Sequence, residues 1–87
     1  MQVRRAGDVV HDVVGGRAVL IDGDGREVIT LNPTGTLVWQ ALDGERELEE
    51  IARAIHDEVQ GATLDQVEAD VRAFVTQLLD EGLVEPV

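Results

Sequence analysis

The sequence contains no cysteine, no lysine and no tyrosine. Without cysteine there are no disulfides, thiolate metal sites or cysteine nucleophiles. Trp39 and Phe74 are the only aromatic residues, so the core must be built from valine, leucine, isoleucine and alanine. No apolar run approaches the roughly twenty residues that cross a membrane, and no signal-like segment follows the N-terminus. We therefore expect a cytoplasmic protein without a membrane partner.

Positive charge is also scarce, because seven arginines face 18 acidic residues and the net charge is −11. Nucleic acids and anionic lipids bind through cations that neutralise phosphates, so both should be repelled. A DNA reader needs a basic recognition helix, whereas residues 64–80 contain Arg72 as their only cation. We expect no nucleic-acid partner.

The length of 87 residues fits one domain, residues 1–87, with a modest core and no room for an ordinary enzyme cleft. Alternating apolar residues separated by glycine-rich turns predict a three-stranded antiparallel meander, and helical periodicity with capping signals predicts three helices after it. The expected strands are 9–14, 17–22 and 27–31, and the expected helices are 33–42, 47–59 and 64–80. We read residues 1–8 as a loose lead-in. The predicted class is α+β, with a winged-helix-like order.

The chain changes from strand to helix within Leu31–Trp39. Asn32 is suited to cap the first helical turn, and Pro33 fits the first helical position because its missing N–H has no partner there. Asp43-Gly44 should then end this helix.

The sequence contains no residue pattern that indicates a catalytic site or a metal site. His11 and His56 lie on separate expected elements without a paired nucleophile. The run Asp22–Glu27 superficially suggests a calcium loop but lacks its twelve-residue spacing, so a hairpin turn explains it better. We expect no enzyme activity, no metal and no cofactor. The carboxylates between Glu45 and Glu50 fit a solvated helix start, or an acidic patch for a basic partner.

The expected third strand, 27–31, has an open edge, because nothing in the meander offers a fourth strand. This strand contains neither proline nor lysine, the usual guards against edge pairing. An extended peptide could add to this edge, or the third helix or the tail could cover it. The third helix could supply a second wall, since Asp70, Ala73, Phe74 and Gln77 flank its apolar stripe. Dimerisation through the same edge is a further possibility.

Several motifs together resemble the PqqD-like family of peptide-recognition domains. They are Leu31-Asn32-Pro33-Thr34-Gly35-Thr36-Leu37-Val38-Trp39, Leu42-Asp43-Gly44, Leu48-Glu49-Glu50-Ile51-Ala52, Asp70-Val71 through Phe74, Leu78-Leu79, and Gly82-Leu83-Val84-Glu85. The resemblance implies a three-stranded sheet on three helices, which binds the leader of a ribosomally made precursor peptide as an added strand. One departure is Glu47, which stands where relatives often carry a serine or threonine cap.

By this resemblance, the leader pairs with the third strand and rests against the third helix. The implied peptide-binding residues are Glu27, Val28, Ile29, Thr30, Leu31, Val67, Asp70, Val71, Ala73, Phe74 and Gln77. Similarity to the stand-alone members of lasso peptide pathways implies a non-catalytic adaptor that delivers the precursor to a leader peptidase, and then to a cyclase. The alternative is a PqqD or mycofactocin-type protein that presents its peptide to a radical-SAM enzyme. We expect a monomer or a weak homodimer, and we expect proline at Ile29 to abolish leader binding.

Overall fold

The computed structural model describes residues 1–87, and its buried apolar side chains form one core cluster. The elements are β1 (Gln2–Arg5), β2 (Val10–Val14), β3 (Arg17–Ile21), β4 (Val28–Thr30), α1 (Pro33–Ala41), β5 (Asp43–Glu47), α2 (Leu48–Glu58), α3 (Leu64–Asp80) and β6 (Val84–Pro86). The predicted α+β class is confirmed, as are the three helices. None of these helices combines the length and apolar character needed to span a bilayer.

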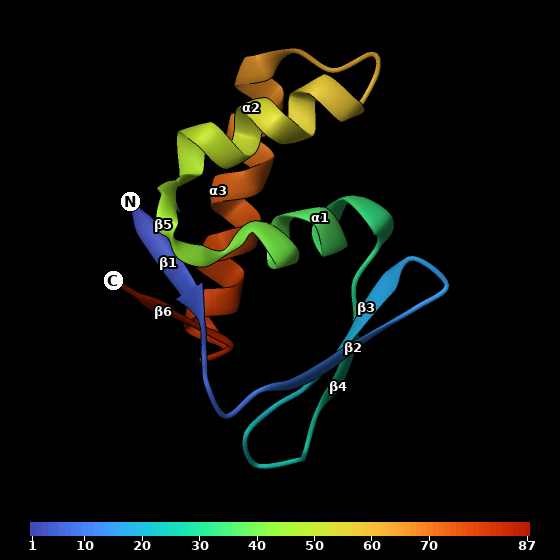
Figure 1. Ribbon diagram of the computed structural model, residues 1–87, viewed down its shortest axis with the longest axis vertical. Coiled ribbons are helices and arrows are strands. Elements are labelled where there is room, and N and C mark those ends of the chain that lie inside the picture. The colour runs from blue at the N-terminus through green and yellow to red at the C-terminus, as the bar shows by residue number, and fades with distance from the viewer.

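Strands β2, β3 and β4 form the predicted antiparallel meander, called here the hairpin sheet. Gly15 and Gly16 both have positive φ, 60° and 78°, as the tight turn between β2 and β3 requires. Ala18 and Leu20 of β3 are fully buried against the helices, whereas every residue of β2 is exposed. In Figure 1 this sheet projects from the helical part of the molecule. Its free edges are therefore open to solvent.

A second antiparallel sheet, called here the terminal sheet, was missed by the sequence analysis. Its strand order is β5-β1-β6, so the residues read as a loose lead-in form its central strand. Arg4 lies opposite both Asp43 and Glu85, and its guanidinium forms an ion pair with Glu85 at 3.1 Å. Figure 1 shows the two chain ends side by side at this sheet. The partner strands of β1 lie about forty and eighty residues away in the sequence. No local sequence pattern therefore predicts the terminal sheet.

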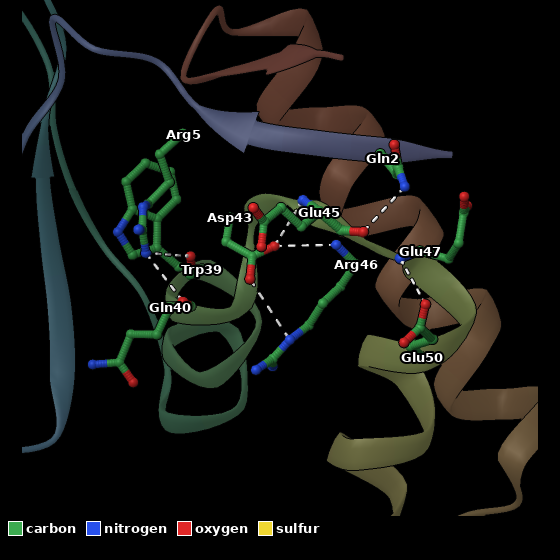
Figure 2. Close-up of polar contacts among 9 residues, drawn as sticks. All are labelled: Gln2, Arg5, Trp39, Gln40, Asp43, Glu45, Arg46, Glu47 and Glu50. Atoms are coloured by element: carbon green, nitrogen blue, oxygen red, sulfur yellow. Dashed lines mark hydrogen bonds and ion pairs between the residues drawn. The ribbon is translucent and has the colours of Figure 1, made fainter.

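The segment after α1 also differs from the prediction, because Asp43–Glu47 forms β5 rather than a simple helix stop. The Asp43 carboxylate accepts hydrogen bonds from the N–H groups of Glu45 and Arg46, at 2.9 and 3.1 Å (Figure 2). These two N–H groups, and then the Arg46 guanidinium, lower the pKa of Asp43. The Arg5 guanidinium donates to the carbonyls of Trp39 and Gln40 and so satisfies the end of α1.

Helix α2 starts firmly despite the unusual residue at its cap. Glu47 and Glu50 form a capping box, in which the Glu50 carboxylate accepts from the Glu47 N–H at 3.3 Å. The Glu47 carboxylate also pairs with the N-terminal ammonium group. A glutamate therefore caps this helix in place of serine or threonine. Glutamate here serves both the helix cap and the attachment of β1.

Trp39 on α1 occupies the centre of the core and is fully buried. The exposed ring of His11 meets its indole edge-to-face, with centroids 5.5 Å apart. The buried Nε1–H of Trp39 has no hydrogen-bond partner. Helices α2 and α3 pack against each other, and Ile51, Ile55, Val71 and Val75 on these helices are buried. The packing holds α3 in place beside the hairpin sheet.

Candidate functional site

The end of β4 is held by a small hydrogen-bond network at the start of α1. The Asn32 side chain accepts from the Gly35 N–H at 2.7 Å, and Pro33 occupies the first helical position, as predicted. The buried Thr36 hydroxyl donates to the Asn32 carbonyl at 2.9 Å and accepts from the Ala18 N–H at 2.8 Å. Because Ala18 belongs to β3, this hydroxyl connects α1 to the hairpin sheet. The direction in which β4 enters α1 is thereby fixed.

A cavity of about 610 Å³ lies between β4 and α3, and it is called here the groove. Its volume falls in the range of ordinary ligand sites. Helix α1 contributes its first turns, and the end of α2 closes one side. The lining residues are Ile29, Thr30, Leu31, Asn32, Thr34, Gly35, Val38, Ile55, Val59, Ala62, Val67, Asp70, Val71, Phe74 and Gln77.

Beside the groove, β4 presents an edge with unpaired main-chain groups. Strand β4 is terminal in the order β2-β3-β4, so only β3 pairs with it. Backbone bonds join Leu31 to Ala18 and Asp22 to Glu27. Since bonded pairs alternate in an antiparallel ladder, Ile29 and Leu20 form the bonded pair between them. The N–H and C=O groups of Val28 and Thr30 therefore point away from β3, toward open space.

The α3 wall combines a buried base with an exposed rim. Val67 and Val71 are buried, Phe74 is half-buried, and Asp70 and Gln77 are exposed. Gly35 lies under the Phe74 ring, because a Cβ at Gly35 would lie 3.4 Å from Phe74 Cζ and 3.1 Å from Asn32 Oδ1. Glycine at this position lets the aromatic ring approach the start of α1. Phe74 thus spans the groove from α3 to α1.

The structure brings together most of the residues predicted from the sequence. Those lining the groove are Ile29, Thr30, Leu31, Val67, Asp70, Val71, Phe74 and Gln77. Glu27, Val28 and Ala73 do not line it, although Val28 contributes main-chain groups to the open edge. The role of all eleven predicted residues in peptide binding stays a prediction.

Sequence reasoning missed the contributions of α1 and α2 to the groove, namely Asn32, Thr34, Gly35, Val38, Ile55, Val59 and Ala62. The Asn-Pro-Thr-Gly run predicted the start of α1, and its residues Asn32, Thr34 and Gly35 also line the groove. Nothing in the periodicity of α2 indicates that its last turn faces a cavity.

Each of the other strand edges carries a feature that disfavours pairing. Edge strand β5 consists mainly of charged residues, and edge strand β6 contains Pro86. On β2, the Asp12 carboxylate accepts from the Val13 N–H at 2.8 Å. Only the edge of β4 has no such guard, and it is also the edge that borders the groove.

The candidate residues for other chemistry are not assembled into a site. No group of three or more histidine, aspartate or glutamate side chains is placed to hold a metal ion. The Asp22 side chain accepts from the Arg26 N–H at 2.8 Å, and its carbonyl accepts from the Gly25 N–H at 2.9 Å. These bonds form the hairpin turn between β3 and β4, as predicted.

Comparison with solved structures finds two close matches in fold. One is described as TbiB1 in complex with the TbiA(beta) leader peptide, with 26% identity, a TM-score of 0.85, and coverage of 97% of this chain and 96% of that chain. The other is described as lasso peptide synthetase B1 complexed with the leader peptide, also with 26% identity and a TM-score of 0.85, covering 99% and 100%. No curated protein sequence matches the chain.

The family comparison covers most of the chain. Residues 17–84 match the family model described as coenzyme PQQ synthesis protein D (PqqD). This region includes the hairpin sheet from β3 onward, the Asn-Pro-Thr-Gly junction and all three helices. The chain therefore belongs to the PqqD family.

Proposed function

We propose that this protein is a non-catalytic adaptor that binds the leader of a ribosomal precursor peptide and delivers it to a leader peptidase in lasso peptide biosynthesis. The observation that carries the proposal is the unguarded edge of β4 beside an apolar groove. The two matching structures, both described as leader-peptide complexes, support leader as the class of ligand. An adaptor of this kind acts by effective concentration, since a tethered substrate meets its enzyme at up to about millimolar levels.

The ladder at β4 defines how the peptide would lie. Two peptide residues would exchange main-chain hydrogen bonds with Val28 and Thr30, which supply affinity with little dependence on sequence. The peptide residue between them would lie opposite Ile29, and its side chain would point into the groove. Side chains of alternate peptide residues would therefore enter the groove, where Phe74 and Val71 provide apolar contacts. Selectivity would come from these positions.

Proline at Thr30 tests strand addition more cleanly than proline at Ile29. The Ile29 N–H faces β3, so its loss damages the hairpin sheet itself, whereas the N–H groups of Val28 and Thr30 face outward. We expect Thr30→Pro to weaken binding about three- to tenfold, as one lost hydrogen bond predicts, and Val28→Pro/Thr30→Pro to weaken it further. The measurement is fluorescence anisotropy with a fluorescently labelled leader peptide.

Val13→Pro is the matched control, because it removes an outward-facing N–H from the opposite edge, on β2. Its affinity for the leader should equal that of the wild type. Equal affinities for the wild type and a folded Val28→Pro/Thr30→Pro variant would exclude strand addition at β4. Delivery is tested separately, by the rate at which the partner peptidase cleaves the precursor with and without the adaptor.

The runner-up is a PqqD or mycofactocin-type protein that presents its peptide to a radical-SAM enzyme. The family description favours this reading, whereas both matching structures favour the lasso pathway. The groove would serve either enzyme in the same way. The two alternatives differ in which enzyme's turnover of the precursor rises when the adaptor is added.

Two other occupants of the surface are less well supported. A second copy could pair through β4, but each copy has a net charge of −11, which opposes association. A nucleic acid would need cations on α3, and Arg72 there is already paired with Glu49. Sizing at several concentrations and a gel-shift assay at low salt test these alternatives, and we expect a monomer and no shift.

A further inference from the structure

Asp70 is the only charged side chain that lines the groove. It is exposed at the rim, whereas its neighbours on the same wall, Val67 and Val71, are buried aliphatic residues. The adjoining residues of α1 and α2, Val38, Ile55 and Val59, are also aliphatic. A single carboxylate thus borders an otherwise uncharged cavity.

The positive charges of the protein are engaged or located elsewhere. Arg4, Arg46 and Arg72 form ion pairs with Glu85, Asp43 and Glu49. Arg5 and Arg17 donate to backbone carbonyls. No arginine lines the groove, and Asp70 takes part in no ion pair of the protein. Its charge is available to a bound ligand.

Asp70 also lies beyond the paired part of the β4 edge. Phe74 meets Gly35 at the start of α1, and Asp70 precedes Phe74 by about one helical turn, on the side of the α2–α3 turn. In Figure 1, α3 runs from that turn down to the terminal sheet, while β4 runs up to α1. A peptide paired with Val28 and Thr30 would therefore reach Asp70 with residues outside its paired segment.

We propose that Asp70 selects peptides in which an arginine or lysine stands next to an aliphatic residue, a few positions beyond the segment that pairs with β4. This inference rests on the proposed function, and it assigns a chemistry to the leader. The aliphatic side chain occupies the cavity among Val38, Ile55 and Val59, and the cation pairs with Asp70. The negative charge of the whole protein attracts the same basic peptide from a distance.

The test is selection from a phage-displayed library of random 12-residue peptides. The targets are the wild type, Asp70→Asn, Asp70→Arg and the control Asp80→Asn, which removes one negative charge from α3 outside the groove. We expect one position to be enriched in arginine or lysine with the wild type and with Asp80→Asn. Enrichment should disappear with Asp70→Asn and change to aspartate or glutamate with Asp70→Arg.

Affinities of one selected synthetic peptide complete the test. Asp70→Asn should weaken binding about two- to fivefold, as expected for an exposed ion pair, and glutamate at the basic position of the peptide should restore binding to Asp70→Arg. Selected peptides that depend on the β4 edge but show no basic position would overturn this inference and leave the proposed function intact. Selection of no peptide that is sensitive to Thr30→Pro would overturn both.

Discussion

At the scale of single residues, Thr36 determines where β4 ends and α1 begins. Its hydroxyl is buried, donates to the Asn32 carbonyl and accepts from the Ala18 N–H. The Asn32 carbonyl also accepts from the Thr36 N–H, whereas the Ala18 N–H depends on the hydroxyl alone. A buried N–H without a partner is costly, because it has lost its hydrogen bonds to water. This role could not be predicted from residue order, since a threonine after Gly35 is equally typical of an ordinary helical position.

Replacement of Thr36 by valine keeps the shape of the side chain and removes both hydrogen bonds. We expect Thr36→Val to lower the free energy of unfolding by about 2–3 kcal/mol, because the buried Ala18 N–H loses its partner. Thr36→Ser keeps the hydroxyl and should cost only about 1 kcal/mol, for one lost methyl group. Urea denaturation of the two variants measures the difference. A Thr36→Val variant as stable as Thr36→Ser would show that the hydroxyl does not stabilise the junction.

At the scale of elements, local sequence patterns predict the hairpin sheet and the three helices, but they do not predict the terminal sheet. The hairpin sheet follows from two tight turns and alternating residues, α2 follows from its apolar stripe, and α3 follows from an apolar stripe with a capping box. Strand β1 has Val3 as its single buried residue, and charged residues dominate β5. Such strands form because distant partners meet after the helices pack, which residue order alone does not reveal.

The same limit applies to the groove. The walls from β4 and α3 could be predicted, because an unguarded strand and a mixed helix flank are visible as residue types. The contribution of Ile55 and Val59 could not, because buried aliphatic residues in a helix look alike whether they face the core or a cavity. Tertiary packing decides which of them remain accessible.

The β5 turn should make stability depend on pH through Asp43. The N–H groups of Glu45 and Arg46 lower its folded-state pKa below the unfolded value, so the unfolded chain takes up the proton first as the pH falls. The stabilisation is therefore complete above the unfolded pKa and is lost as the pH falls through the folded pKa.

Asp43→Asn isolates this contribution, because asparagine can accept the same two hydrogen bonds without titrating. We expect the wild type to be more stable than Asp43→Asn at pH 6, and the difference to shrink as the pH approaches 3. Thermal unfolding of both proteins between pH 6 and pH 3 measures this difference in stability. A difference that stays constant with pH would contradict a role for the Asp43 charge.

At the scale of the whole molecule, the net charge of −11 opposes the compact state through repulsion, while the surface ion pairs contribute little. Salt screens this repulsion. We therefore expect the urea midpoint of unfolding to rise between about 10 mM and 300 mM sodium chloride. Over the same range the affinity for an arginine-containing peptide selected on the wild type should fall. If both quantities changed in the same direction, charge would not be the common cause.

The alternation along β4 has a consequence for how this surface can change over time. Every amino acid except proline has the same main-chain donor and acceptor. Substitutions of Val28 and Thr30 can therefore accumulate without changing the main-chain groups that the β4 edge presents to a peptide. The number of residues between β4 and α1 cannot change in the same way. A single residue inserted between Thr30 and Asn32 would shift β4 by one residue relative to the start of α1. The main-chain N–H and C=O groups that point toward β3 and those that point toward the open edge would then be exchanged.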